Sequence, residues 1–335
     1  MKDLDRHNAI IVVTGGAGYV GSRCVNTLCE RGFFVRAVDK ISPEEHGFSL
    51  HSDAEFLKGD LRNTSFARRA LSGAKTVLHL AANIGPLSYM RDHEAEILQE
   101  NAAIDAVLYD AAIDSGKPCI VYSSSSMVFQ HAPVYPYREA DLSRVLLPTN
   151  IYGMSKLIGE YFCRAYSRQH GLPFVILRYH NIYGPGEDSK GSSPGDIHVI
   201  PALIAKTLFG QYPLELLGGE RATRPFTYID DAVSVTVEIV SRAHARGPEV
   251  INEDFNIGPS EATRIVDAAC MVWEIAGDGR PFQYKVKETS AVTAERREMT
   301  SDKIERAIGW KPKVSLQDGI KKTVEWMTRR KQGII

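Results

Sequence analysis

The chain has 335 residues, which is enough for one large α/β unit or two modest domains. Apolar residues make up 44% and charged residues 24%, a mixture typical of globular proteins that argues against wholesale disorder. There are 40 lysines and arginines against 41 aspartates and glutamates. The resulting net charge of −1 gives no support for bulk binding to nucleic acid or to an anionic membrane.

The start of the chain and its apolar segments carry no signal for export or membrane insertion. No apolar run approaches the ~18–20 residues that span a bilayer. Residues 1–8 are charged and run directly into a short apolar stretch, unlike a secretory signal. The cysteines have no metal-ligand spacing and are scattered over positions 24, 29, 119, 163 and 270. We therefore expect a cytoplasmic protein with reduced thiols and no metal site.

Apolar, β-branched segments alternate with helical segments through the first half of the chain. This pattern predicts strands over residues 9–13, 33–38, 55–58, 76–80, 118–123 and 173–179. It predicts helices over residues 19–31, 65–71, 94–115 and 152–170. The alternation indicates an α/β fold of the Rossmann type, a doubly wound parallel sheet that binds ligands beyond the carboxyl ends of its strands.

The chain changes character after Asn181. Residues 184–196 are rich in glycine, proline and serine, which predicts a loop. Later elements are predicted as helices over 200–209, 230–243, 301–310 and 316–329 and a strand over 255–257. We expect residues 1–180 to form the larger domain, with a return segment near 225–260. Residues 181–335 are expected to form most of a smaller, mostly C-terminal substrate-binding domain.

A glycine-rich loop, TGGAGYVG, follows the first predicted strand and precedes a predicted helix. Gly15, Gly18 and Gly21 are spaced three apart in it. The first permits a tight turn, the second lets a pyrophosphate approach the backbone, and the third lets helix and strand pack closely. Amide groups at the helix N-terminus then face the phosphate charge. The loop therefore predicts a dinucleotide site.

Two acids follow the next predicted strands. Asp39 ends the second strand, where its carboxylate can accept hydrogen bonds from the adenosine ribose hydroxyls. It would repel a 2′-phosphate, which favours NAD over NADP, and the neighbouring Lys40 could offset part of that repulsion. Asp60 follows the third strand, where an acid can reach the adenine amino group.

Tyr152 and Lys156 are four residues apart on a predicted helix, which places both side chains on one face. The reference pKa of a phenol is about 10, and a neighbouring ammonium together with oxidised nicotinamide favours the phenolate. The tyrosine could then take a proton from a sugar hydroxyl as hydride leaves for the cofactor, and the lysine could hold the nicotinamide ribose. The preceding strand ends in four serines at 123–126, one of which could hydrogen-bond the reacting oxygen.

Together these motifs resemble the extended short-chain dehydrogenase/reductase superfamily, in particular its NAD-dependent nucleotide-sugar epimerases and dehydratases. The resemblance covers nearly the whole chain. It rests on TGGAGYVGS at 14–22, GDLR at 59–62, HLAA at 79–82, SSSSMVF at 123–129, YGMSK at 152–156, LRYHNIYGPG at 177–186, RPFTYIDD at 224–231 and SDKIERAIGW at 301–310. It implies that Ser125 is the catalytic serine, Tyr152 the base and Lys156 its partner.

The resemblance also implies where the two ligands bind. The expected cofactor-binding residues are Gly15, Gly18, Tyr19, Val20, Gly21, Asp39, Lys40, Asp60, Leu61, Leu80, Ala81, Ala82, Asn101, Ser123, Tyr152, Lys156 and His180. The expected substrate-binding residues are Ser125, Ser126, Asn181, Lys190, Arg224 and Arg297. Among these, Asn181 and Arg224 match contacts to the nucleotide diphosphate, and Arg297 matches a second arginine more loosely. The planar fork of arginine pairs with phosphate oxygens in bidentate fashion.

The residues after Ser125 bear on the type of reaction. Related dehydratases carry an Asp-Glu pair there and related decarboxylases usually a glutamate, whereas this chain has Ser126 and Met127, which disfavours both reactions. Lys190 lies at the spacing of an acid/base lysine in GDP-mannose 3,5-epimerase, but Met127 stands where that enzyme has the partner cysteine. Lys190 could instead bind phosphate or lie in solvent. His180 could pack against the nicotinamide or join proton transfer.

A C4 epimerase needs no further acid or base. The sequence therefore favours an NAD-dependent nucleotide-sugar epimerase that acts at C4 through a transient 4-keto-sugar and recycles its bound NAD. The alternatives are a 4-keto-sugar reductase or dehydrogenase, a relative resembling a 3,5-epimerase or a decarboxylase, and a non-catalytic NAD-bound protein. Helices predicted over 94–115 and 153–170 carry apolar stripes beyond the needs of one sheet face. Relatives pair two such helices with a second subunit, so we expect a homodimer.

Overall fold

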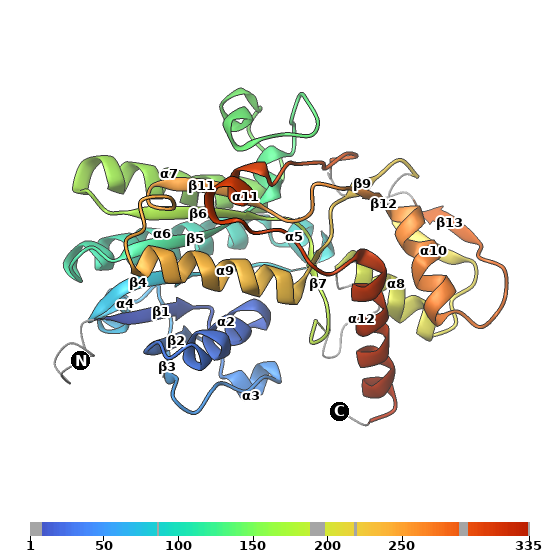
Figure 1. The fold of residues 1–335 in the computed structure, drawn as a ribbon, viewed down its shortest axis with the longest axis horizontal. Helices are drawn as coiled ribbons and strands as arrows, with labels where there is room; N and C mark the ends of the chain where they lie inside the picture. The colour runs from blue at the N-terminus through green and yellow to red at the C-terminus, as the bar shows by residue number, and fades with distance from the viewer. Residues whose placement is uncertain (1–8, 86, 188–197, 218–219, 288–293, 334–335) are drawn as a thin grey trace.

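A computed structural model describes residues 9–85, 87–187, 198–217, 220–287 and 294–333 (Figure 1). Its centre is a seven-stranded parallel sheet in the order β11-β6-β5-β4-β1-β2-β3. The strands are β1 (Ile10–Thr14), β2 (Val35–Asp39), β3 (Glu55–Lys58), β4 (Ala74–His79), β5 (Cys119–Ser125), β6 (Phe174–Tyr179) and β11 (Glu253–Ile257). The predicted Rossmann-type sheet is confirmed, and its strand order reverses between β1 and β4, where such sheets bind ligands.

Helices cover both faces of the sheet because alternate strand residues point to opposite sides. Ile11 and Val13 pack in one core cluster with residues of α2 (Tyr19–Glu30) and α9 (Ile229–His244). Val12 packs in another cluster with residues of the helices on the opposite face. Those helices are α4 (Thr64–Leu71), α6 (Glu94–Asp114) and α7 (Ile151–His170).

A second group of elements follows β6 and lies at one end of the molecule (Figure 1). It contains α8 (Val199–Leu208), α10 (Ile265–Ala276), α12 (Leu316–Lys331) and the paired strands β8 (Leu214–Leu217) and β13 (Tyr284–Lys287). α11 (Asp302–Ile308) packs near β11 in the main body. The domain boundary near residue 180 stays a prediction, and β11 shows that the chain returns to the main sheet.

Several short elements were not predicted. They are α3 (Pro43–His46), α5 (Leu87–Asp92), the 3-10 turns η1 (Ser126–Phe129) and η2 (Glu139–Arg144), and the strands β7 (Ile182–Tyr183), β8, β9 (Thr223–Arg224), β10 (Thr227–Tyr228), β12 (Thr263–Arg264) and β13. Two-residue strands carry no periodic signal. α10 was also missed, although Ile265, Ala268, Ala269 and Val272 fall at helical spacing and are buried. Most of the predicted loop over 184–196, with Lys190, lies outside the described residues.

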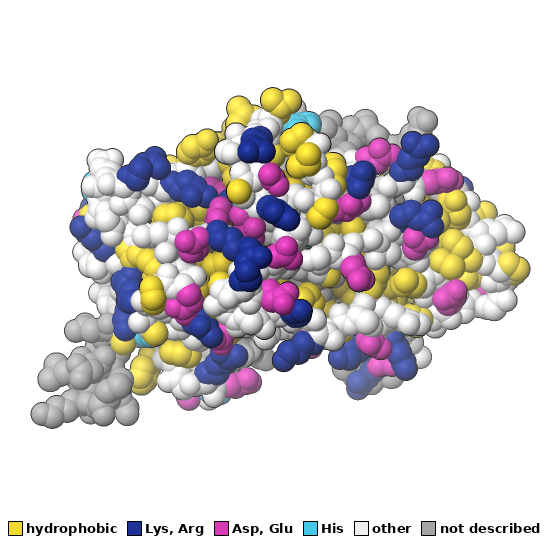
Figure 2. All heavy atoms as spheres, turned by 45° about the horizontal axis from the view of Figure 1, so that its top comes forward, with side chains coloured by type: hydrophobic (Ala, Val, Ile, Leu, Met, Phe, Trp, Pro, Cys, Tyr) yellow, Lys and Arg dark blue, Asp and Glu magenta, His cyan; other side chains and the backbone are white. Residues whose placement is uncertain are grey.

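The surface mixes both signs of charge. Figure 2 shows basic and acidic side chains interspersed over one face, with apolar side chains gathered at its upper edge. Val134, Leu146 and Leu147, between β5 and α7, are among the large apolar side chains that are exposed. Within the described ranges, no helix has the length and apolar character needed to cross a bilayer.

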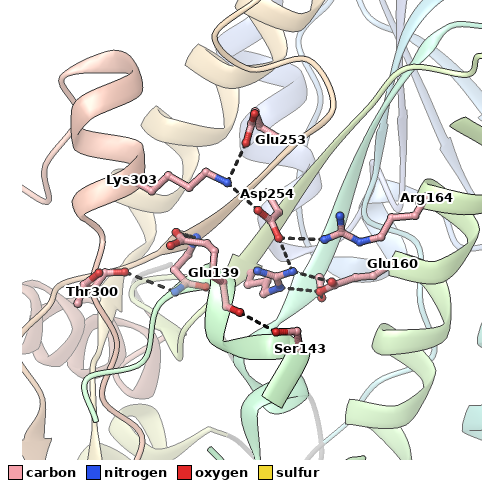
Figure 3. Close-up of polar contacts among 12 residues, drawn as sticks. Glu139, Ser143, Glu160, Arg164, Glu253, Asp254, Thr300 and Lys303 are labelled. Atoms are coloured by element: carbon pink, nitrogen blue, oxygen red, sulfur yellow. Dashed lines mark hydrogen bonds and ion pairs between the residues drawn. The ribbon is translucent and has the colours of Figure 1, made fainter. Parts of the chain in front are cut away.

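A buried charge cluster joins the sheet to the C-terminal segment (Figure 3). Arg178 on β6 is fully buried and donates two hydrogen bonds of 2.7 Å to the carboxylate of Glu160 on α7. It donates a third, also of 2.7 Å, to Asp254 on β11. Lys303 on α11 donates to the other oxygen of Asp254 at 2.7 Å. Burial alone would raise the pKa of Asp254, but Arg178 and Lys303 outweigh it and lower that pKa below its usual range.

Replacing Arg178 with methionine should lower the free energy of unfolding by about 3–5 kcal/mol, because it leaves Glu160 and Asp254 buried without their main partner. Arg164→Met is the matched control: Arg164 donates to the same Asp254 oxygen at 2.9 Å from a side chain that is 37% exposed. That change should cost less than about 1 kcal/mol. Urea unfolding measures both, and equal losses would contradict the role given to the buried pair.

Candidate functional site

The glycine loop lies between β1 and α2, and two of its glycines are required by close packing. Gly15 has a φ of +68°, and a Cβ there would lie 2.9 Å from the backbone nitrogen of Ala81. A Cβ on Gly21 would lie 2.0 Å from the carbonyl oxygen of Gly15. These contacts allow no side chain, so the turn, the end of β4 and the start of α2 meet with their backbones in contact.

Gly18 is different, because the space above it is open. A Cβ there would meet only the Gly15 oxygen, at 3.4 Å. Gly18 is the N-cap of α2 and offers no side chain to the free N–H groups of the first turn. An open backbone at a helix N-terminus is what a pyrophosphate needs in order to bind there. The loop therefore fits a dinucleotide.

Asp39 is fixed at the end of β2 against this loop. Its two carboxylate oxygens accept hydrogen bonds of 3.2 Å from the backbone nitrogens of Ala17 and Ile41. Lys40 is exposed, and its Nζ lies 3.8 Å from Glu100 rather than beside Asp39. In this geometry Lys40 is therefore poorly placed to offset the repulsion between Asp39 and a 2′-phosphate.

Asp60 is already engaged with a neighbouring side chain. It forms an ion pair of 2.6 Å with Arg62, and the hydrogen bonds from Arg62 lower the pKa of the carboxyl. Leu61 beside it is buried, and Leu80, Ala81, Ala82, Tyr19 and Val20 are partly exposed around the loop. Contacts of these residues with the cofactor stay predictions.

Asn101 on α6 is buried, and its side-chain amide forms hydrogen bonds within the protein. Its Nδ2 donates to the carbonyl oxygen of Asn83 and to the Ser155 hydroxyl, both at 3.1 Å. Its Oδ1 accepts a hydrogen bond of 2.6 Å from the backbone nitrogen of Asn83. Asn101 thus ties the segment after β4 to the helix that carries Tyr152 and Lys156. Its direct contact with the cofactor stays a prediction.

The three expected catalytic side chains come together at the carboxyl end of β5. Ser125 ends that strand, and its side chain lies near that of Tyr152 on α7. Lys156, one turn further along α7, is 4% exposed, and its Nζ lies 5.9 Å from the centroid of the Tyr152 ring. Ser123 is partly exposed and Ser126 is buried beside them.

The effect of Lys156 and bound oxidised nicotinamide on the pKa of Tyr152 stays a prediction, and burial acts on both side chains in the protein alone. Burial raises the pKa of the Tyr152 phenol, and the nearby Ser125 side chain opposes it. Burial also lowers the pKa of Lys156 to about 8, against the negative charge of Asp105. Burial is therefore the largest influence on the pKa of each group in the protein alone, and the four-residue spacing does not reveal it.

Arg224 on β9 and Arg297 lie on adjacent segments and are both buried. The backbone nitrogen of Arg297 donates to the oxygen of Thr223 at 3.2 Å. Arg224 donates to the carbonyl oxygens of Thr223 and Glu295, at 2.7 and 3.0 Å. Nε of Arg297 is buried without a hydrogen-bond partner among the described residues.

These two guanidinium groups form no ion pair with a carboxylate in the described part of the chain. Burial, followed by the charge of Arg297, lowers the pKa of Arg224 to about 9. Two desolvated cations side by side are unfavourable unless an anion binds them. Asn181 lies close by and donates to the carbonyl oxygen of Pro225 at 3.1 Å. This arrangement suits a diphosphate.

His180 is fully buried at the end of β6 and has a partner that the sequence did not reveal. Its Nε2 and the Tyr137 hydroxyl are hydrogen-bonded at 2.7 Å, and the two rings stack with centroids 5.7 Å apart. Burial, and then the charges of Arg297 and Arg224, lower the pKa of His180 well below its usual value. His180 is therefore neutral. Tyr137 lies outside every motif and periodic segment of the sequence, so nothing pointed to it.

The sequence profile of the "NAD dependent epimerase/dehydratase family" matches residues 11–258, about three-quarters of the chain. The chain belongs to this family. Its members are extended short-chain dehydrogenase/reductase enzymes of nucleotide sugars, and NAD is the cofactor. The resemblance deduced from the motifs is thus confirmed.

Individual family members share the whole length of the chain. A dTDP-4-dehydro-6-deoxy-D-allose reductase of Streptomyces sp is 28% identical over 96% of this chain and 97% of its own. The structure of UDP-glucose 4-epimerase from Thermotoga maritima with UDP-glucose has a TM-score of 0.82 and 27% identity, covering 96% and 99% of the two chains. That of UDP-glucuronic acid 4-epimerase from Bacillus cereus, with UDP-glucuronic acid and NAD, has a TM-score of 0.82 and 26% identity at the same coverage.

A pair of glycine substitutions separates cofactor binding from folding. Gly18→Ala should change the free energy of unfolding by less than about 1 kcal/mol, the range of substitutions that disturb no packing. It should weaken NAD binding, because the added methyl group occupies the open space above the helix N-terminus.

Gly21→Ala should instead destabilise the fold, because its Cβ meets the Gly15 oxygen. Thermal unfolding and calorimetric titration with NAD measure the two effects. Unchanged NAD affinity in G18A would remove Gly18 from the cofactor site.

Proposed function

We propose that this family member is an NAD-dependent nucleotide-sugar epimerase that acts at C4. The observation that carries the proposal is the meeting of Ser125, Tyr152 and Lys156 at the edge of the sheet, with no further acid or base directly after the serine. Met127, which follows Ser126, is buried and cannot exchange a proton. The two 4-epimerase structures that share the fold over nearly the whole chain support the same reaction.

In the proposed mechanism, the Tyr152 oxygen takes the proton from the C4 hydroxyl of the sugar. Ser125 hydrogen-bonds the same oxygen and holds it beside the phenol. Bound NAD supplies the site that accepts a hydride and later returns it. Lys156 stabilises the phenolate by its positive charge. Rotation of the 4-keto-sugar in the site would present its other face, and Tyr152 would return the proton to the C4 oxygen.

The substrate is held by its diphosphate in this proposal. Arg224 and Arg297 supply two buried positive charges, and Asn181 lies beside them. Binding of the diphosphate there leaves the sugar free to turn, which C4 epimerisation requires. His180 is buried and neutral, so we assign it packing next to the site rather than proton transfer. Lys190 lies outside the described residues, and its phosphate contact stays a prediction.

A 4-keto-sugar reductase is the second candidate, because a Streptomyces reductase is similar over the whole chain. The two reactions differ in what happens to the cofactor. An epimerase keeps its NAD, whereas a reductase must exchange it in every turnover. We therefore favour the epimerase if absorbance and mass spectrometry detect NAD released by denaturing the purified protein, and the reductase if turnover needs added NADPH.

The reaction itself is tested with a panel of nucleotide sugars, with products identified by mass spectrometry and proton NMR. A C4 epimer of unchanged mass supports the proposal, and a reduced product opposes it.

We also propose a homodimer formed through α6 and α7, where Tyr161 is 61% exposed and Phe162 is partly buried. Sedimentation measures the subunit number.

Tyr152→Phe should lower the rate of hydride transfer by about 10²–10⁴, the contribution of a positioned general base. NAD should stay bound, because the ring is retained. Tyr284→Phe is the control, since the Tyr284 hydroxyl donates to Glu220 at an exposed site on β13, outside α6 and α7, and its rate should not change. Single-turnover absorbance of the reduced cofactor measures the rate, and substantial turnover in Y152F would contradict the assigned base.

Arg224→Ala should weaken substrate binding by about 1.5–3 kcal/mol, the scale of a hydrogen bond to a charged group. Arg296→Ala is the matched control, because Arg296 lies in the same region but is exposed and paired with Glu298 at 2.8 Å. Its affinity should stay within about 0.5 kcal/mol of the wild type. Titration with the nucleoside diphosphate follows both variants. Unchanged affinity in R224A would remove that arginine from the site.

A further inference from the structure

A carboxylate that the proposed mechanism does not use lies behind the catalytic lysine. Asp105 on α6 is 3% exposed. Its Oδ1 accepts a hydrogen bond of 2.9 Å from His79 Nε2, and its Oδ2 accepts one of 3.3 Å from the Tyr122 hydroxyl. No lysine or arginine among the described residues forms an ion pair with it. A carboxylate buried in this way is costly unless positive charge lies near it.

Thr14 and His79 form a chain of hydrogen bonds that ends at Asp105. The backbone nitrogen of Ala81 donates to Thr14 Oγ1 at 3.3 Å, so the Thr14 hydroxyl is free to donate to His79 Nδ1 at 2.7 Å. His79 then carries its proton on Nε2 and donates it to Asp105. Thr14 directly precedes the glycine loop. The chain of hydrogen bonds therefore connects that loop, through His79, to the buried carboxylate of Asp105.

Lys156 shares the environment of this carboxylate. Its Nζ lies 5.1 Å from the ring centroid of Tyr122, whose hydroxyl donates to Asp105. Gly159 on α7 permits this packing, because a Cβ there would lie 1.9 Å from the Tyr122 hydroxyl and 2.7 Å from Asp105 Oδ2. The missing side chain lets α7 approach α6 and β5, so that Lys156 and Asp105 face a common buried space.

We propose that Asp105 is a positioning residue for Lys156: its buried carboxylate keeps the lysine ammonium charged, and His79 ties that carboxylate to the start of the glycine loop. The part of Lys156 in catalysis rests on the proposed function, whereas its charge state does not. Asp105 thereby links the cofactor loop on β1 to the catalytic helix α7.

The other groups beside Lys156 carry no charge that could replace Asp105. Tyr122 from β5 and Tyr152 from α7 are phenols, and Cys163 is a thiol on α7. Burial raises the pKa of each, so all three are protonated and neutral in the protein without cofactor and substrate. His79 from β4 lies behind Asp105 and has both ring nitrogens hydrogen-bonded.

Glu160 is the other acid on this side of α7, one turn beyond Lys156. Its carboxylate is already paired with Arg178 through two hydrogen bonds of 2.7 Å and accepts a third, of 2.6 Å, from Ser124. Its charge is therefore largely neutralised. Burial lowers the pKa of Lys156, and Asp105 is the charge that opposes this effect.

The test follows the titration of Lys156 itself in the full-length protein. Lysine labelled with ¹³C at Cε is observed by NMR from neutral to alkaline pH, and Lys156→Met identifies the resonance. Asp105→Asn keeps the shape of the side chain and removes its charge. The midpoint of the Lys156 titration should then fall by about one pH unit or more, the usual effect of losing a close opposite charge.

Asp110→Asn is the matched control, because Asp110 lies on the same helix and accepts a hydrogen bond from Tyr166 but is exposed. Its midpoint should equal that of the wild type. An unchanged midpoint in D105N, or an equal fall in D110N, overturns the proposal. If circular dichroism shows that D105N is unfolded, Asp105→Ser removes the charge in its place and must show the same fall.

This measurement needs no substrate, so its outcome is independent of whether the proposed reaction is correct. Where turnover is observed, the alkaline limb of the pH–rate profile should also move to lower pH in D105N, because the charged form of Lys156 is lost at lower pH. A merely structural role for Asp105 would lower the rate at every pH and leave that limb in place.

Discussion

Positive charge that is buried without a full counter-charge is the constraint on which this site depends. Lys156, Arg224 and Arg297 each lie inside the protein, and burial lowers the pKa of all three. Such groups cost stability in the free protein because each has lost most of its hydration. The cost is offset when an anion binds. A diphosphate and a phenolate are anions of the kind that these positions would stabilise.

The buried carboxylates determine where those cations can lie. Glu160 joins Ser124, beside the catalytic serine, to Arg178 on the neighbouring strand and to the helix that carries Lys156. Asp105 does the same from α6, through Tyr122 and His79. Each acid is fixed by hydrogen bonds from two or more elements, so neither can move without disturbing the sheet. The proposed catalytic residues therefore lie on a rigid support, as a reaction that depends on sub-ångström placement requires.

The sequence predicted the elements whose signal is local. Continuous apolar runs identified the strands of the main sheet, and the glycine loop identified its ligand edge. Short strands such as β9 and β12 were missed because they are held by pairing with distant segments and not by their own pattern. Tyr137 and Asp105 were missed for the same reason, since their importance comes from contacts with His180 and with Tyr122. The spacing of Tyr152 and Lys156 gave their proximity, but it carried no information on how far burial shifts their pKa.

The geometry also explains how one site can serve related reactions. In the proposed reaction, hydride removal at C4 needs only Ser125, Tyr152 and Lys156, which lie on β5 and α7. The step that follows hydride removal would depend on residues directly after β5 and in later segments. At two such positions the chain has Met127 and the neutral His180, and neither is a charged acid or base. In the proposed reaction, neither of these two described side chains would remove a proton from the carbons next to the keto group. In the proposed reaction, the keto-sugar would therefore be reduced again by return of the hydride. The face of the sugar that receives the hydride would depend on whether the sugar can turn while its diphosphate stays bound.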